Sequence, residues 1–309
     1  MAHMFDVPPI PLQQHPGFAA ALRACGQSPL MLPGAEPILV MRRRLWRGLP
    51  VAMMSRARLN PDTLSTQVNG TDLQRNLLIL SPDQPMPSLA NLGAIPLISP
   101  TAIAEIDLRQ STEMRRVGLK QKWRNRLNHA ESTKSLRIVQ KTMPPDATHW
   151  LFTANTMLQK QRGFRNWSTA LTLAYGRENP GQTRLFTAYD GRDPIAAMLF
   201  LRHGAGTTYH ISFSTDRGRQ LSAHNLLLWC ACDWLAANGH RLLDLGMLNT
   251  EDAPGLARFK LGAGARPRLL GGTWVWWPPM RQLLRPLAQF DRQLMRPPDL
   301  WTEASGTVI

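Results

Sequence analysis

Cysteine is scarce in this sequence, with only Cys25, Cys230 and Cys232 among 309 residues. Three thiols cannot complete a four-cysteine zinc site, and the Cys-x-Cys pair lies in an apolar stretch that reads as a helix. Packing in a core is therefore favoured over redox or metal chemistry for that pair. The eight histidines are scattered without the spacing of metal ligands. We predict that the protein has no metal site.

The sequence also lacks a long uninterrupted apolar segment. Its most apolar stretch, NLLLWCACDWLAANG, is broken by Asp233, whereas a membrane-spanning helix needs about 20 apolar residues. The first residues, MAHMFDVPPIPLQQHPG, do not have the basic-then-apolar layout of a signal peptide. We expect a soluble, cytoplasmic protein, and a peripheral contact with a membrane stays open.

Acidic residues are few relative to basic ones. The chain has 36 Lys and Arg against 21 Asp and Glu, which gives a net charge of +15 and a pI near 11.0. Such a surplus favours anionic partners, namely RNA, phosphorylated substrates or an acidic membrane surface, without choosing among them. The length allows two modest domains or one large one.

The first third of the chain reads as strands and loops. EPILVMRRRLWRGLPVAMMSR has the pattern of two strands around an Arg-Gly-Leu-Pro bend, and RNLLILSP and AIAEIDL are further strand candidates. Ser111 or Thr112 can then cap a helix.

A basic helix is predicted over residues 111–134. Leu119, Trp123, Leu127 and Ala130 form one apolar stripe along it. Its other faces are crowded with positive charge, and residues 115–126 contain no acid. Two interpretations are open, a solvated surface or a surface that meets phosphates, because like charges repel unless an anion is bound. The basic residues are Arg115, Arg116, Lys120, Lys122, Arg124 and Arg126.

The second half of the chain has a more regular pattern. A helix ending at Arg162-Gly163 precedes three strand candidates, TRLFTAY, PIAAMLFLR and TTYHISF, which short turns join as antiparallel neighbours. A buried helix ended by Gly239 then leads to the strand RLLDLG, which is most simply parallel to the strand before it. We predict an α/β (α+β) fold with a mixed sheet, in which an antiparallel meander ends in one parallel β-α-β step.

Two parallel strands that diverge leave a ligand site at their carboxyl ends. Lys260 follows the second of these strands by a short loop, in a turn with Gly262 and Gly264. The lysine is predicted to point into the site. The alternative is a surface charge anchored by an inward-packing Phe259.

Three stretches in this order resemble the FemAB-like branch of the Gcn5-related N-acyltransferase (GNAT) superfamily. They are KQKWRNRLNHAE, QKQRGF and LLDLG…GLARFKLGAG, and the resemblance spans about residues 115–275. It implies two GNAT-like lobes: a degenerate lobe over 1–112, an acyltransferase lobe over 113–280, and a C-terminal helix and tail over 281–309.

The resemblance also implies an activity, the transfer of an acyl or aminoacyl group from acyl-CoA or aminoacyl-tRNA onto a substrate amine. No cofactor is expected to be tightly bound. The expected partners are a small-molecule or cell-envelope amine, tRNA and an anionic membrane. The rival hypothesis is a non-catalytic basic module of the same fold that binds RNA or an anionic membrane surface.

One segment departs from the superfamily pattern. Acyl-CoA users typically have an Arg/Gln-x-x-Gly-x-Gly/Ala loop, whose backbone N–H groups hold the pyrophosphate at a helix N-terminus. Here the stretch is TDRGRQLSAHN, with Gln220 and Ser222 where glycines belong. This favours a donor other than coenzyme A. Ser222, Ala223 and Asn225 at the helix start remain candidate substrate-binding residues.

The candidate catalytic residues are Lys260, Asp244 and His210. The resemblance implies that the lysine acts on the transferring group or the donor's phosphates. Asp244 either caps its turn or positions the amine, and His210 is either a structural histidine or a general base.

The remaining candidates are binding residues. Arg162 and Arg165 are solvated charges or ligands of a phosphate or carboxylate, and Asn249 is a turn former or a substrate ligand. The candidate phosphate-binding residues are Lys120, Lys122, Arg124 and Arg126.

Tryptophans gather near the C-terminus. The alternation in TWVWW suits a last strand whose tryptophans pack on the core. Trp beside Arg near a tail is also typical of a membrane interface.

Overall fold

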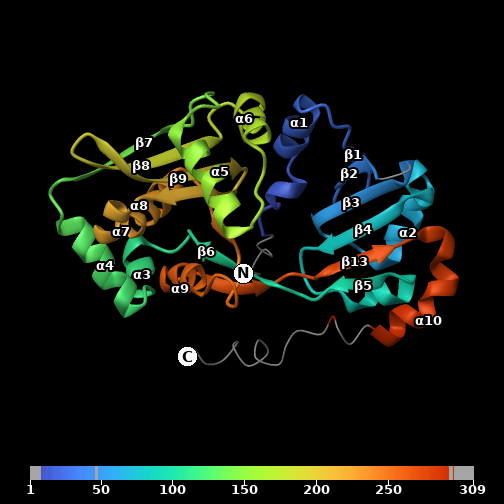
Figure 1. The fold of residues 1–309 in the computed structure, drawn as a ribbon. Coiled ribbons are helices and arrows are strands. Elements are labelled where there is room, and N and C mark those ends of the chain that lie inside the picture. Colours follow the sequence, from blue (N-terminus) through green and yellow to red (C-terminus); the bar gives the residue numbers. More distant parts are fainter. Residues whose placement is uncertain (1–7, 46–47, 292–294, 296–309) are drawn as a thin grey trace, which may run out of the picture. The chain divides into compact units, whose positions relative to one another are not determined.

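The computed structural model describes residues 8–45, 48–291 and 295 (Figure 1). The chain forms two compact units, each described by itself below. The first combines the described residues of Met1–Leu12 with Ile103–Pro267 and is called the seven-stranded unit. The second combines the described residues of Gln13–Ala102 and of Arg268–Ile309 and is called the six-stranded unit.

The seven-stranded unit is built on a mixed sheet with the order β12-β6-β11-β10-β9-β8-β7. Strands β7 to β10 form an antiparallel meander, and β11 lies parallel to β10. This confirms the predicted fold class, including the single parallel step in this sheet. The strands are β6 (Ala102–Asp107), β7 (Leu136–Thr142), β8 (Thr183–Asp190), β9 (Asp193–His203), β10 (Gly206–Ser214), β11 (Leu242–Met247) and β12 (Arg266–Leu269).

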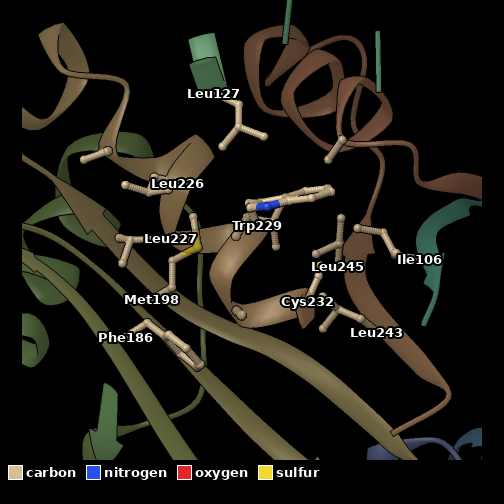
Figure 2. Packing of buried hydrophobic residues seen from close by; sticks show 14 of the residues in the cluster. Ile106, Leu127, Phe186, Met198, Leu226, Leu227, Trp229, Cys232, Leu243 and Leu245 are labelled. Carbon is tan, nitrogen blue, oxygen red and sulfur yellow. The ribbon is translucent and has the colours of Figure 1, made fainter. Parts of the chain in front are cut away.

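Helices cover both faces of this sheet, which explains why β9 is apolar without alternation. Phe186 and Met198 belong to a large core that includes Trp229 of α8 (Figure 2). Their chain neighbours Leu185 and Leu199 belong to a second core with residues of α5. The helices are α3 (Thr112–Val117), α4 (Gln121–Ser132), α5 (Trp150–Arg162), α6 (Thr169–Glu178), α7 (Asp216–Gln220), α8 (Ala223–Ala237) and α9 (Pro254–Gly262).

The Cys-x-Cys pair lies on α8, as the apolar pattern predicted. Cys232 is 4% exposed within the large core, and burial raises the pKa of its thiol to about 12. Cys230 is partly buried and packs against the same core. Both thiols therefore stay protonated near neutral pH and act as small apolar side chains.

The predicted single basic helix is in fact two helices, α3 and α4. Ser111 caps α3 by accepting a hydrogen bond from the Met114 N–H, as predicted. The chain turns at Gly118, and the Lys120 N–H donates to the Gly262 carbonyl at 3.0 Å. That bond ties the start of α4 to the end of α9. Trp123, Leu127 and Ala130 of the apolar stripe lie on α4, and Leu119 lies in the turn before it.

The six-stranded unit has the order β1-β2-β3-β4-β13-β5. Within it, β2 and β3 are antiparallel and β3 and β4 are parallel, with α2 between them. The strands are β1 (Leu30–Leu32), β2 (Ile38–Arg44), β3 (Pro50–Ala57), β4 (Leu77–Pro82), β5 (Ile95–Ile98) and β13 (Thr273–Trp276). The helices are α1 (Pro16–Ala24), α2 (Pro61–Asn69) and α10 (Arg281–Asp291), with short 3-10 turns η1 (Leu12–Gln14), η3 (Asp72–Arg75), η4 (Pro87–Leu92) and η5 (Pro278–Met280).

The TWVWW segment is a strand, but it belongs to the sheet built from the N-terminal third. Strand β13 lies between β4 and β5, and Trp274 and Trp276 are fully buried in that unit's core. The compact units are therefore discontinuous in sequence, unlike the predicted lobes with limits at residues 112 and 280. Burial of two tryptophans is the physical reason, since each buries a large apolar area.

No helix within the described ranges is both long enough and apolar enough to cross a membrane.

Candidate functional site

The candidate site lies where β10 and β11 part. The two strands are paired only from Gly206↔Leu242 to Thr208↔Asp244, although β10 continues to Ser214 and β11 to Met247. The predicted divergence of the parallel pair is therefore present. Beyond it, β10 is paired on one side only, with β9.

Side chains bond to several carbonyls of β10 beyond this point. Asn166 Nδ2 donates to the His210 carbonyl at 3.0 Å, and His224 Nε2 donates to the Phe213 carbonyl at 3.0 Å. Arg219 Nη1 donates to the Ser214 carbonyl at 2.7 Å. These bonds come from the α5–α6 loop, α8 and α7, and they hold the divergent part of β10 in place without a second strand.

Lys260 lies in the last turn of α9, not in a glycine-rich turn as predicted. The helix begins with Pro254 in its first turn, a position that suits proline. The side chain of Lys260 is only 4% exposed, and its Nζ donates to the Met247 carbonyl at 2.7 Å. The ammonium is thus held at the end of β11.

Burial alters the acidity of this ammonium. Desolvation lowers the pKa of Lys260 to about 8, and the charge of Asp244 opposes the shift. A lysine in this state is mostly protonated at neutral pH. It is also poorly hydrated, so it interacts more strongly with a nearby negative charge than a surface lysine would.

Asp244 is the carboxylate of this region. It is 8% exposed in β11, and its Oδ1 accepts a hydrogen bond from the Gly246 N–H at 2.7 Å. Gly246 has φ +77, a conformation that favours glycine. The Asp-x-Gly sequence therefore forms a capped bend at the end of the strand, next to the Met247 carbonyl that Lys260 binds.

The two glycines after Lys260 have roles other than flexibility. A Cβ on Gly262 would lie 2.9 Å from Trp123 Cδ1, so this glycine makes room for the indole of α4. Gly264 has φ +83 and starts the path toward β12. Phe259 lies between Trp123 and His224, with ring centroids 6.1 and 6.2 Å away, and so anchors α9.

His210 is buried in a separate environment. Its Nε2 lies 2.8 Å from the Thr172 hydroxyl of α6, and its ring lies against Trp167 with centroids 4.9 Å apart. Burial lowers the pKa of His210 to about 3. These are the contacts of a satisfied structural histidine, and such a weak base would accept a proton poorly at neutral pH.

The predicted donor loop contains the short helix α7. Thr215 caps it by accepting from the Gly218 N–H, and a Cβ on Gly218 would lie 2.5 Å from the Ile195 carbonyl oxygen. Ser222 has φ +54, a left-handed conformation at a position where the superfamily pattern has glycine. Ala223 and Asn225 are buried, and Asn225 Nδ2 has no hydrogen-bond partner within the described part of the chain.

The other predicted binding residues lie on the surface. Arg162 ends α5 and Arg165 follows it, both exposed. Asn249 accepts hydrogen bonds from the N–H groups of Glu251 and Asp252, as a turn former does.

The positive charges of α3 and α4 fall into two groups. Arg115 binds Asp233 at 2.6 Å, and Arg116 binds Glu131 at 2.6 Å. Arg124 donates to the carbonyls of Val117 and Leu119. Those three arginines have structural partners. The sequence did not reveal the partner of Arg115, because Asp233 is distant along the chain. Three exposed cations complete the set: Lys120, Lys122 and Arg126.

Residues that the sequence analysis missed also contribute to this region. His224 and Arg219 hold β10, and the Met247 carbonyl holds Lys260. One local signal was present in the sequence: Pro254 marks the start of α9, the helix that contains Lys260. No short motif announces a histidine that bonds to a strand carbonyl.

The fold is that of a two-lobed GNAT protein. Residues 118–261 match the acetyltransferase (GNAT) domain family, in agreement with the seven-stranded unit described above. A search of the curated proteins gave no match.

Solved structures with the same fold cover most of the chain. FemX matches with a TM-score of 0.72 and 11% identity, over 91% of this chain and 96% of its own. The C-terminal domain of a putative lysylphosphatidylglycerol synthetase from Agrobacterium fabrum has a TM-score of 0.57 and 14% identity, over 92% and 93%. L-PGS from Bacillus licheniformis has a TM-score of 0.53 and 12% identity, over 92% and 100%. Residues 118–261 are thus similar to the acetyltransferase (GNAT) domain family, and the fold is shared with FemX, as the predicted resemblance implies.

Proposed function

We propose that the protein transfers an acyl or aminoacyl group onto a substrate amine where β10 and β11 diverge. The observation that carries this proposal is the buried ammonium of Lys260 beside Asp244 at the carboxyl ends of the two parallel strands. A buried cation at that edge is costly for folding alone, and α/β proteins commonly bind ligands there.

The chemistry needs few groups. A neutral amine attacks the carbonyl carbon, a C–N bond forms, and negative charge develops on the carbonyl oxygen. Lys260 has three N–H donors and uses one on the Met247 carbonyl. In the proposed reaction its remaining donors stabilise that oxyanion. Collapse of the intermediate then expels the donor's alkoxide or thiolate, which takes up the proton lost by the amine.

Asp244 has the charge and the place to position the amine. Its Oδ1 accepts from Gly246, and a carboxylate has further lone pairs for an ammonium or amine N–H. His210 is left out of the proposed chemistry because it is bound to Thr172 and is too weak a base.

Aminoacyl-tRNA is the donor that we favour. Coenzyme A users hold the pyrophosphate with a glycine loop. In this chain helix α7 and the tightly packed Gly218 take the place of that loop. The exposed cations Lys120, Lys122 and Arg126 suit the phosphates of an RNA. A cell-envelope acceptor is supported by the fold shared with a putative lysylphosphatidylglycerol synthetase.

A transfer assay tests the proposal. Total bacterial tRNA charged with labelled amino acids is incubated with the protein and three amine acceptors: phosphatidylethanolamine, a lysine-containing muropeptide and Nα-acetyl-lysine. We expect transfer to one of them, and weak or absent binding of acetyl-CoA in calorimetry. Micromolar affinity for acetyl-CoA would restore an ordinary acyl-CoA mechanism. Tight tRNA binding without transfer to any acceptor would favour the non-catalytic module.

A further inference from the structure

Helix α10 exposes an apolar face that its own packing does not use. Its inner side, with Ala288 fully buried, packs on η4 and β5 of the six-stranded unit (Figure 1). Leu283, Leu287 and Phe290 are 71%, 50% and 82% exposed. Their spacing of four and three residues places them on one stripe of the helix. The helix is therefore apolar on two sides.

Exposure of three large apolar side chains in a row is uncommon on a free surface, and such patches mark interaction sites. The helix has 11 residues, about half of what a membrane span requires. It could lie in the plane of an interface instead.

Residues before the helix and on the side opposite the stripe have the chemistry of a membrane interface. Trp277 is 40% exposed just before the helix, and tryptophan prefers the boundary between headgroups and acyl chains. Arg281 and Arg285 are exposed one turn apart on α10, on the side of the helix opposite the stripe, so their long side chains would have to reach back to the headgroups. Arginine side chains can lie along the apolar boundary while their guanidinium groups reach phosphates.

We propose that α10 docks the protein on an anionic lipid surface. In the docked state Leu283, Leu287 and Phe290 enter the acyl boundary, and Trp277, Arg281 and Arg285 contact the headgroup layer. The net charge of +15 provides long-range attraction to such a surface. This proposal does not depend on the acyltransfer reaction, because it concerns the six-stranded unit and is measured by binding alone.

Vesicle flotation tests the proposal. The full-length protein is mixed with phosphatidylcholine vesicles that contain or lack 30% phosphatidylglycerol. We expect wild type to float with the anionic vesicles, and Leu283→Gln/Phe290→Gln to partition at least about tenfold less, because two apolar side chains no longer enter the membrane. Arg281→Gln/Arg285→Gln should weaken binding about fivefold per arginine, on anionic vesicles only.

Val117→Gln/Met157→Gln is the matched control, since it removes two exposed apolar residues, 70% and 60% exposed, from the other unit. All these positions are exposed, so melting temperatures should agree. Three results would overturn the proposal. Wild type could fail to float with anionic vesicles. The α10 variant and the control could float equally. Light scattering could instead show a dimer that Leu283→Gln/Phe290→Gln converts to monomer, which would assign the stripe to a second copy.

Discussion

The two units contain the same supersecondary sequence, an antiparallel pair followed by a parallel step through a helix. In the six-stranded unit, β3 and β4 stay paired from Val51↔Leu77 to Ala57↔Pro82, along almost their whole length. In the seven-stranded unit, β10 and β11 separate after Thr208↔Asp244. The carboxyl ends of the parallel strands are therefore paired in the six-stranded unit, and this end of its sheet is called the closed edge. They are apart in the seven-stranded unit, and this end of its sheet is called the open edge.

The charged groups at these edges differ in the same way. At the closed edge, Asp83 accepts from Arg56 Nε at 2.7 Å and from Arg268 Nη2 at 3.3 Å, so its charge is paired. At the open edge, the Lys260 ammonium is held by a neutral carbonyl near Asp244. The comparison teaches that topology alone does not make a site. Strand divergence and a buried lysine beside Asp244 distinguish the proposed transfer site from its structural counterpart.

The largest effect is expected at the open edge. Lys260→Met should lower the transfer rate by about 10² to 10³, the usual cost of removing one oxyanion donor. Lys260→Arg should restore only part, because a planar guanidinium cannot take the place of a compact ammonium. Single-turnover transfer from aminoacyl-tRNA is the measurement. Met fills a similar volume, so the variant should still fold. Full activity in Lys260→Met would make the lysine a structural residue.

The closed edge should respond in stability instead. Asp83→Ala leaves two guanidinium groups without their carboxylate and should cost about 2–3 kcal/mol of unfolding free energy. Transfer per folded molecule should stay at the wild-type level. Urea unfolding and the same transfer assay give both values. Asp72→Ala, which breaks the exposed pair with Arg42, is the control and should cost about 0.5 kcal/mol or less. If folded Asp83→Ala lost transfer activity, the closed edge would not be purely structural, and the contrast between the two edges would be wrong.

The fold of the seven-stranded unit could be predicted because its signals are local. Short turns fix the meander, and the apolar helix before RLLDLG fixes the parallel step. The position of TWVWW could not be predicted, because an alternating strand looks the same whichever sheet it joins. Its pairing with Leu78 and Leu80 of β4 joins residues that are far apart in sequence.

The sequence predicted the position of the candidate site better than the surroundings of its side chains. Asp-x-Gly at a strand end and a lysine soon after it pointed to the end of β11, where Asp244 and Lys260 lie together in the structure. Burial of that lysine was not readable, since a lysine beside glycines is usually solvated. The neutral state of His210 depends on Thr172 and Trp167, which only the folded chain brings together.

The buried ammonium of Lys260 should also give a pH dependence. The pKa of Lys260 is lowered from 10.5 to about 8 in the folded protein. Between these values the unfolded chain binds more protons than the folded one, so stability rises with pH. Between pH 8 and pH 10 the free energy of unfolding of wild type should therefore rise by about 2 kcal/mol relative to that of Lys260→Met. Urea unfolding of both proteins across that range is the measurement. A constant difference would mean that the lysine is well solvated.

The basic surfaces of the two units offer a further test. Lys122→Glu/Arg126→Glu should weaken tRNA binding about tenfold, and two lost phosphate contacts should reduce the salt slope by about 1.5. Arg43→Glu/Arg44→Glu reverses two exposed arginines of the six-stranded unit and serves as the matched control. Filter binding at several salt concentrations gives both quantities. Equal losses in the two variants would indicate general attraction by net charge.

The smallest effect concerns two residues with left-handed backbone, one in each unit. Ser222 precedes α8 at φ +54, and Arg56 lies at the β3 bulge at φ +52. Ser222→Gly removes strain of about 1 kcal/mol and loses part of that gain to the greater freedom of glycine in the unfolded chain. We expect a net gain of about 0.5 kcal/mol, or a rise of one to two degrees in melting temperature. Arg56→Gly removes similar strain but also the bond to Asp83, so it should destabilise the protein. If Ser222→Gly raises stability and Arg56→Gly lowers it, the left-handed Arg56 at the closed edge is retained for its ion pair. A gain in both variants would mean that the Arg56–Asp83 bond contributes little, and the contrast between the two edges would then rest on strand divergence alone.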